Sequence, residues 1–587
     1  MTAEFKSLLD YISKRRKVQL IFLTILTFFG SFLEVFSIGL IFPFITVFLD
    51  PSLVFENHYV KPILDNLSIT SVKELFLPIT VAFFLITTSS YIIRSVLIFA
   101  RSKLSRIIIQ EISSLMYWRI INENYEFHVN QNSGDIITGV SKSLGIAASL
   151  ILPILRILNS SLLLFFAIIG TVFIDIRITL VIIISLFIFY YLVVIAINNK
   201  LNSYSNIQNN NYSNLIKIIQ ESLGAIKIII LNKAQKVFYK NYNKITNEYL
   251  RSISMVEFIS LLPKLLFEYT ILVVILFTIY YFRNEESLGV LIPTIITFLV
   301  AIQRLLPEVN SLYTNIVKIK TNKASVERVL NYLMLNNSYP VYKQIKVEKL
   351  SFKKALELKD VSFKYKNEEK NVISNLSLTI LKGQKVGIVG ESGSGKSTLI
   401  DLISGLLFPT SGQIKIDGVC LDKKNNNTWK NHVNVISQDI FLFDSTIAEN
   451  IAFTNDHSLI DFQKLEEVCK ISELTDFIDN LKDGIFSMIG ERGVKISGGQ
   501  IQRIGIARAL YRSSDLLILD EATSALDQDT EFNVMEKIIK YSSSSTLIII
   551  AHRLTTLKNC DIIFKLGSNK LEVFNNYSTL IKKIDNE

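Results

Sequence analysis

Long apolar runs dominate the first half of the chain. Each is long enough to cross about 30 Å of hydrocarbon as a helix that rises about 1.5 Å per residue. Six runs of this kind occur, at residues 18–48, 75–100, 147–173, 178–197, 253–282 and 288–317. One such run can be a buried core helix, but no soluble core needs six in series. The pattern therefore predicts six membrane-spanning helices.

The polar segments between these runs keep a helical period. The segments after the second and fourth runs are long, so the spans on either side are expected to continue beyond the membrane as helices, with reversals at 124–136 and 221–228. Ahead of the first run, Phe5, Leu8, Leu9 and Ile12 share one helical face. This face predicts a short interfacial helix, and a plain solvated extension is the alternative.

The pattern changes in the second half, where short apolar strands end in polar motifs. A strand at 385–389 and a helix at 397–403 flank Gly390-Glu-Ser-Gly-Ser-Gly-Lys-Ser-Thr398, which fits the phosphate loop G-x-x-x-x-G-K-[ST]. Its glycines let backbone N–H groups wrap phosphates at a helix N-terminus. Lys396 is placed to reach the β- and γ-phosphates of a nucleotide.

Three further strands end in candidate catalytic residues. The strand at 516–519 runs into Asp520 and Glu521, one for Mg²⁺ and the other beside the attacking water. Gln438 follows the strand at 433–436, and His552 follows the strand at 546–550. Singly, a Gln or a His in a loop is more often structural, but this order and spacing are jointly specific.

With Ile496-Ser-Gly-Gly-Gln500 about a hundred residues after the phosphate loop, the second half resembles an ATP-binding-cassette domain. In that family the phosphate loop of one copy faces the signature of another, with two ATP molecules between them. The resemblance implies these ATP contacts: Tyr365, Gly390, Ser392, Gly393, Gly395, Lys396, Ser397, Thr398, Ser497, Gly498, Gly499, Gln500 and Asp527. It implies Ser397, Gln438 and Asp520 as Mg²⁺ ligands, and Glu521, His552 and Gln438 as the catalytic group. No motif is degenerate, so both sites of a dimer are expected to hydrolyse ATP.

The fold class that follows is an α-helical membrane domain joined to an α/β P-loop NTPase domain. The expected parts are a transmembrane domain at 1–330 that includes the interfacial helix, a linker at 331–347 and the cassette at 348–587. A chain of 587 residues, 49% hydrophobic, agrees with this division. The arrangement resembles six-helix exporters, in which the two reversals are coupling elements. One cassette needs a second copy, so a homodimer is expected and a heterodimer remains open.

Basic residues set the orientation. Lys and Arg concentrate before the first run and in the segments after the second and fourth runs, which places these segments in the cytoplasm. The cassette then lies in the cytoplasm too, where ATP is. The same bias explains the net charge of +10, so nucleic acid is not an expected partner. The three cysteines, all in the cassette, indicate neither disulfides nor a metal site.

Charges inside the spans point to the cargo. They are Glu34, Arg94, Arg156, Lys264, Glu268, Arg304 and Glu308. Such charges are costly and usually functional. One interpretation is internal pairing that holds the bundle together. The other is that Arg94, Lys264 and Arg304, with Glu34, line a cavity that binds an anionic group such as a pyrophosphate.

Local sequence favours the second interpretation. Residues 34–44 (EVFSIGLIFPF), 263–268 (PKLLFE) and 304–307 (RLLP) resemble flippases of lipid-linked oligosaccharides of the PglK type. The resemblance implies an ATP-driven flippase in a bacterial inner membrane and a short external helix within 50–71. Lys264 stands where an arginine is common in such flippases, and Ser311 stands where a further basic residue is expected, so a weaker or different anionic site is an alternative. A lipid or multidrug exporter, and an ATP-gated channel or regulator, are the other readings.

Overall fold

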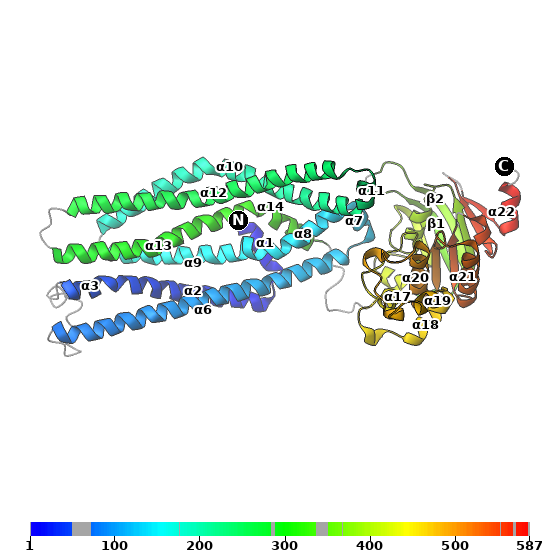
Figure 1. Cartoon of the computed structure of the whole chain (residues 1–587), viewed down its shortest axis with the longest axis horizontal. Helices are drawn as coiled ribbons and strands as arrows, with labels where there is room; N and C mark the ends of the chain where they lie inside the picture. The colour runs from blue at the N-terminus through cyan, green and yellow to red at the C-terminus, as the bar shows by residue number, and fades with distance from the viewer. Residues whose placement is uncertain are drawn as a thin grey trace. The chain divides into compact units, whose positions relative to one another are not determined.

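The computed structural model describes residues 2–49, 72–174, 176–282, 288–335, 350–366, 368–551, 553–567 and 571–584 (Figure 1). The chain divides into two compact units. The first, called the helical unit, comprises Met1–Glu123 and Gln131–Tyr342, and the second, called the cassette unit, comprises Asn124–Asn130 and Lys343–Glu587. The division at Tyr342 falls inside the predicted linker, and the predicted external helix lies outside the described residues.

The helical unit is built almost entirely of α-helices. They are α1 (Thr2–Asp10), α2 (Lys14–Gly39), α3 (Ile41–Leu49), α6 (Val72–Ile121), α8 (Ser133–Ile146), α9 (Leu152–Ile174), α10 (Ile176–Gly224), α11 (Ile226–Leu231), α12 (Gln235–Phe282), α13 (Leu288–Thr321) and α14 (Lys323–Leu333). A π-helical turn at Ala147–Ile151 joins α8 to α9. The short helix α7 (Tyr125–Asn130) belongs to the cassette unit. Short helices, α7 and α11, therefore stand at the two predicted reversals.

Three of the helices are far longer than a membrane is thick. α6, α10 and α12 have 50, 49 and 48 residues, or about 75 Å each at 1.5 Å per residue, against about 30 Å of hydrocarbon. The predicted continuation of the spans as helices is thus seen in the structure. Among the described residues, Lys14–Val47, Glu74–Ile121 and Ala148–Phe173 are long and apolar enough to cross a membrane. The other three predicted spans coincide with α10, α12 and α13.

Within the helical unit, α2 packs between α6 and α9, and α9 packs against α13 (Figure 1). Close approach of α2 and α6 depends on Gly30, because a Cβ there would lie 2.6 Å from Cδ1 of Leu97. Large apolar side chains such as Phe22 and Phe99, 66% and 67% exposed, face outward on the same helices. An apolar outer face is what a helix bundle in lipid requires.

The N-terminal helix α1 forms as predicted, and protein covers part of its apolar face. Leu8 and Ile12 are buried within the protein, 0% and 4% exposed, and α1 packs against α14. Tyr11 adds a contact with α6, because the Arg119 guanidinium lies 4.9 Å from the Tyr11 ring centroid. Protein therefore covers Leu8 and Ile12, and the interfacial position of the helix stays a prediction.

The cassette unit contains two sheets. An antiparallel sheet has the order β2-β1-β4-β5, and a mainly parallel sheet has the order β10-β9-β3-β8-β7-β6. The strands are β1 (Ala355–Phe363), β2 (Ile373–Leu381), β3 (Lys385–Gly390), β4 (Ser411–Ile416), β5 (Val419–Cys420), β6 (Val433–Ile436), β7 (Leu516–Asp520), β8 (Thr546–Ile550), β9 (Ile562–Leu566) and β10 (Leu571–Phe574). The predicted α/β class is confirmed.

The cassette unit also contains α-helices besides α7. They are α15 (Lys396–Ile403), α16 (Asn426–Lys430), α17 (Ile447–Ala452), α18 (Phe462–Ile471), α19 (Thr475–Asp479), α20 (Gly498–Tyr511), α21 (Gln528–Tyr541) and α22 (Tyr577–Ile584). The central strands are continuous buried apolar runs, as expected for a parallel sheet covered on both faces. Every residue of β8 is buried.

Candidate functional site

The parallel sheet brings the predicted nucleotide residues to one edge. β3 and β7 both pair with β8, in a register that sets Ile550 opposite Ile388 on one side and Asp520 on the other. All three strands run in the same direction, so the phosphate loop after β3 and the acids at the end of β7 emerge at the same edge, one strand apart. The carboxyl edge of a parallel sheet is the usual place for a ligand.

Glycines shape the phosphate loop. Gly393 and Gly395 have φ values of +83° and +90°, in the left-handed region that a side chain disfavours. At Gly390 a Cβ would lie 2.5 Å from the Leu566 carbonyl oxygen. Gly395 is the N-cap of α15, so the free N–H groups of this helix open into the loop. The loop is a backbone cradle that suits an anion.

Polar side chains of the loop have partners that a phosphate could replace. Lys396 Nζ donates to the carbonyl oxygens of Gly390 and Glu391, both at 2.8 Å. The hydroxyl of Tyr365, the predicted adenine-stacking residue, lies 3.3 Å from Thr398 Oγ1. The Ser394 hydroxyl is buried without a partner among the described residues. These hydrogen-bond donors are suited to binding an anionic ligand.

The acidic pair ends β7. Glu521 has a φ of +52°, and its N–H donates to the Ile550 carbonyl at 3.1 Å, which ties the end of β7 to β8. On α15, burial and then the charge of Asp520 raise the pKa of Asp401 to about 6, so negative charge is concentrated here.

The other predicted site residues lie on separate segments. Gln438 is exposed beyond β6, and His552 lies outside the described residues. Ser392 and Ser397 belong to the loop and α15.

The signature motif forms the beginning of α20. Ser497 is its N-cap, and its hydroxyl accepts from the N–H of Gln500 at 3.3 Å while the Gln500 side chain accepts from the N–H of Ser497 at 2.8 Å. This is a capping box, which an S-x-x-Q pattern predicts and the sequence analysis overlooked. Gly498 and Gly499 are the first two residues of α20. The side-chain oxygen of Gln500 takes part in this cap, and its contact with ATP stays a prediction.

A second residue of α20 connects the signature to the loop after β7. Gln502 is 6% exposed; its amide nitrogen donates to Ser524 Oγ at 2.9 Å, and its amide oxygen accepts from the N–H of Ala525 at 2.8 Å. Asp527 then caps α21 by accepting from the N–H of Thr530, and this hydrogen bond lowers the pKa of Asp527. Gln502 lies outside the motif residues and was not predicted.

Glu531 was also missed, although it accepts hydrogen bonds from three side chains close to the acidic pair. It is 9% exposed on α21 and accepts from Thr523 Oγ1 at 2.9 Å and Thr556 Oγ1 at 3.1 Å. Arg553 Nη1 forms an ion pair with it at 2.6 Å. Glu531 therefore joins the segment after Glu521 to the segment that begins directly after His552. No short sequence motif predicts the role of such a residue.

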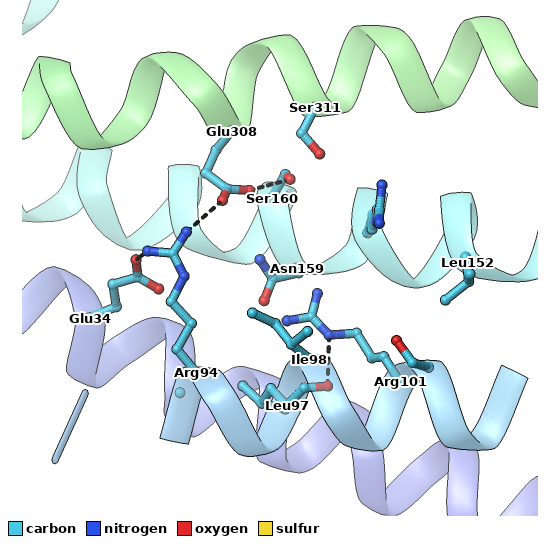
Figure 2. Close-up of a pocket in the computed structure, with 13 residues that line it drawn as sticks. Glu34, Arg94, Leu97, Ile98, Arg101, Leu152, Asn159, Ser160, Glu308 and Ser311 are labelled. Carbon is cyan, nitrogen blue, oxygen red and sulfur yellow. Dashed lines mark hydrogen bonds and ion pairs between the residues drawn. The ribbon is translucent and has the colours of Figure 1, made fainter. Parts of the chain in front are cut away.

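The helical unit contains a polar cavity of about 260 Å³. Its lining residues are Gly30, Glu34, Arg94, Leu97, Ile98, Arg101, Ser102, Leu152, Arg156, Asn159, Ser160, Glu308 and Ser311. They come from α2, α6, α9 and α13 (Figure 2). Arg94 stands between two acids, with Glu34 at 2.9 Å and Glu308 at 3.9 Å, and Ser160 donates to Glu308 at 2.5 Å. Internal pairing, one of the two interpretations of the span charges, holds for this triad.

The four predicted cavity residues are not all brought together. Glu34 and Arg94 line the cavity, but Lys264 and Arg304 are absent from its described lining. Lys264 lies 3.8 Å from Glu268 one turn away. Arg304 donates to Tyr91 Oη at 3.0 Å and to Ser37 Oγ at 3.3 Å. In their place the cavity contains Arg156, which was named above only as a span charge, and Arg101, which directly follows the second apolar run.

Comparisons with known proteins identify both units. Residues 18–305 match the profile of the ABC transporter transmembrane region, and residues 373–524 match that of the ABC transporter ATP-binding domain. The ATP-dependent lipid A-core flippase of Francisella novicida is 31% identical over 403 residues, which cover 67% of each chain. The chain belongs to the ABC transporter family.

Other relatives of this ABC transporter are matched over shorter stretches. The heterocyst differentiation ATP-binding protein HepA of Nostoc is 36% identical over 292 residues, 50% of this chain and 47% of HepA. The lipid A-core flippase of Bordetella avium is 38% identical over 216 residues, so the chain spans about a third of it, 36%. A solved bacterial Atm1-family ABC exporter with ATP bound shares the fold, with a TM-score of 0.77, 20% identity, and 97% and 96% of the two chains covered.

Proposed function

We propose that this ABC transporter is an exporter-type translocase that hydrolyses ATP to move an anionic amphipathic lipid across the membrane. The observation that carries the proposal is the meeting of the phosphate loop with Asp520 and Glu521 at one sheet edge. It occurs in a chain whose other unit is an apolar helix bundle with a charged cavity. The fold that the chain shares with an ABC exporter supports export as the direction of transport. The lipid A-core flippases among the relatives of the chain support a lipid cargo.

The nucleotide residues take roles that follow from their positions. Lys396 would exchange its two carbonyl partners for phosphate oxygens, and the N–H groups of the loop and of α15 would donate to the same phosphates. Glu521 would orient and deprotonate the attacking water. His552 is proposed to contact the γ-phosphate. Tyr365 would leave Thr398 to stack on adenine.

Magnesium is the cofactor that this donor set fits. A hydroxyl of Ser397, an amide of Gln438 and a carboxylate of Asp520 are all oxygen donors, which Mg²⁺ prefers, usually with phosphate oxygens completing its shell. When bound, the ion would supply neutralisation of phosphate charge.

Two copies would form the working unit. The chain has one phosphate loop and one signature, and in ABC transporters these face each other across two cassettes. The N-terminus of α20, with Ser497, Gly498 and Gly499, would present N–H groups to the γ-phosphate held by the partner copy. A homodimer in a bacterial inner membrane, with the cassettes in the cytoplasm, is the proposed assembly.

The finer proposal for the cargo is a polyprenyl-pyrophosphate-linked oligosaccharide. It rests on the likeness of residues 34–44, 263–268 and 304–307 to flippases of such lipids. The cavity is lined by three arginines and two glutamates, and its arginines can bind a pyrophosphate. The test is ATP hydrolysis by the full chain in lipid nanodiscs, with polyprenyl diphosphate, lipid A or an uncharged hydrophobic drug added. We expect Mg²⁺-dependent hydrolysis that the anionic lipids stimulate. Stimulation by the uncharged drug alone would contradict the proposal and indicate a multidrug exporter.

A further inference from the structure

The charges that line the cavity do not balance. Two carboxylates, Glu34 and Glu308, face three guanidinium groups. Arg94 lies within 4 Å of both acids, and the acid side chains are only 11% and 14% exposed. The two acids are therefore engaged by Arg94, with Ser160 as a further donor to Glu308 (Figure 2).

Arg101 and Arg156 are left without such a partner. Arg101, 9% exposed on α6, donates from Nε to the Leu97 carbonyl of its own helix at 3.2 Å (Figure 2). Arg156, on α9, has an exposed side chain. Within the part of the chain that the structure describes, neither has a carboxylate within the 4 Å of an ion pair. Each guanidinium carries five N–H donors, so most of these donors remain for a ligand.

Neutral polar groups also line the cavity near these two arginines. Ser102, Asn159 and Ser311 line the same cavity and add hydroxyl and amide groups. Arg101 is buried and Arg156 is exposed, and like charges that line one cavity repel each other, so an anion between them lowers this cost. The volume of about 260 Å³ is several times the roughly 30 Å³ of one water molecule in the liquid, so a phosphate or pyrophosphate group fits.

We infer that Arg101 and Arg156 form an anion subsite that binds the phosphate or pyrophosphate group of the lipid cargo. Guanidinium groups bind such oxyanions through paired, charge-assisted hydrogen bonds. The subsite rests on the proposed function and deepens it, because it replaces the predicted set of Arg94, Lys264 and Arg304 with two arginines that form no ion pair within 4 Å among the described residues. Arg94 instead keeps the buried acids neutralised.

The test measures binding to the full chain purified in detergent without nucleotide. Farnesyl diphosphate, farnesyl monophosphate, the uncharged alcohol farnesol and phosphatidylglycerol are the probes. We expect Arg101→Gln and Arg156→Gln each to weaken farnesyl diphosphate binding about 10- to 100-fold, with farnesol binding unchanged. The matched control is Lys103→Gln, a basic residue on α6 that does not line the cavity, for which we expect no change.

The two phosphate sources are separated by the remaining probes. Equal sensitivity of phosphatidylglycerol binding to both substitutions would assign the subsite to a bilayer phospholipid, whereas sensitivity of the diphosphate alone assigns it to the cargo head group. Unchanged diphosphate binding in properly folded Arg101→Gln and Arg156→Gln proteins would overturn the inference, as would an equal loss of farnesol binding. Elution as a single species and unchanged basal ATP hydrolysis confirm the fold of each variant.

Failure of the inference is distinct from failure of the proposed function. If the wild-type protein binds the diphosphate through these arginines but never moves a lipid in vesicles, the translocase proposal fails and the subsite stands. If the wild type moves the lipid and both variants do so at the same rate, only the subsite fails.

Discussion

Glu521 directly follows Asp520 at the end of β7 and has a φ of +52°, a backbone conformation that residues with side chains seldom adopt. Such backbone geometry persists where the surrounding structure enforces it, and it clusters at functional sites. Here the hydrogen bond from its N–H to Ile550 holds it beside β8. The position of one carboxylate is thus set by two neighbouring strands.

Glu521→Gln should keep the shape of the side chain and remove the carboxylate that orients water. We expect ATP binding to remain near wild type while turnover falls by about 10²–10⁴-fold. Steady-state hydrolysis and nucleotide binding, measured on the same preparation, check this. Lys396→Ala is the contrasting variant and should lose ATP binding itself. Wild-type turnover in Glu521→Gln would remove Glu521 as the base.

Arg94 is a residue whose predicted and structural roles differ. Truncation in Arg94→Ala would remove the ion-pair partner of the buried Glu34 and Glu308, so we expect destabilisation of about 1–3 kcal/mol and a lower unfolding temperature. The double variant Glu34→Gln/Arg94→Gln should regain part of the loss, because the uncompensated charge is smaller. Thermal unfolding in detergent measures both. Unaltered stability with lost lipid binding would instead make Arg94 a cargo contact.

At the scale of elements, two hydrogen-bonded connections join the parts of the nucleotide site. Gln502 connects the signature helix α20 to the loop after β7, and Glu531 on α21 connects that loop to the segment after β8. The ends of β7 and β8 are already neighbours in the sheet. Rigid side-chain supports of this kind keep catalytic groups in productive geometry.

Glu531→Gln tests the second connection. The change keeps the size of the side chain but removes the ion pair with Arg553, so we expect kcat to fall about tenfold or more with little change in KM for ATP. The effect should be on kcat because the phosphate loop makes no part of this connection. Glu536→Gln, an exposed position on the same helix, is the matched control. A lowered melting temperature with wild-type kcat would reduce Glu531 to a purely structural residue.

At the scale of the whole molecule, the sequence predicted the long helices and the motif-bearing strand ends because both follow from local pattern. A long apolar run predicts the helix α6, and an apolar strand followed by glycines predicts the phosphate loop after β3. The pairing of Arg94 with Glu34 joins residues 60 positions apart on two helices, and only packing decides it. The same holds for Arg101 and Arg156, and for Glu531, which has no motif around it.

The capping role of Gln500, unlike these long-range contacts, could have been predicted from the sequence. The S-x-x-Q pattern was present in the sequence, but the motif was read for its ligand and not for its helix. The burial of Leu8 and Ile12 was missed because a one-sided apolar face predicts burial without naming the neighbour. Lipid and protein are equally apolar partners for such a face.

ATP-driven movement of an anionic lipid is the central claim, and reconstituted vesicles test it most directly. The full chain is placed in vesicles that contain a fluorescent polyprenyl-diphosphate lipid, and the lipid in each leaflet is measured after Mg²⁺ and ATP are added. We predict that wild-type protein moves the lipid to the leaflet opposite the cassettes, whereas the Glu521→Gln protein in matched vesicles does not. An equal leaflet distribution for the two proteins, with hydrolysis intact in the wild type, would contradict the account.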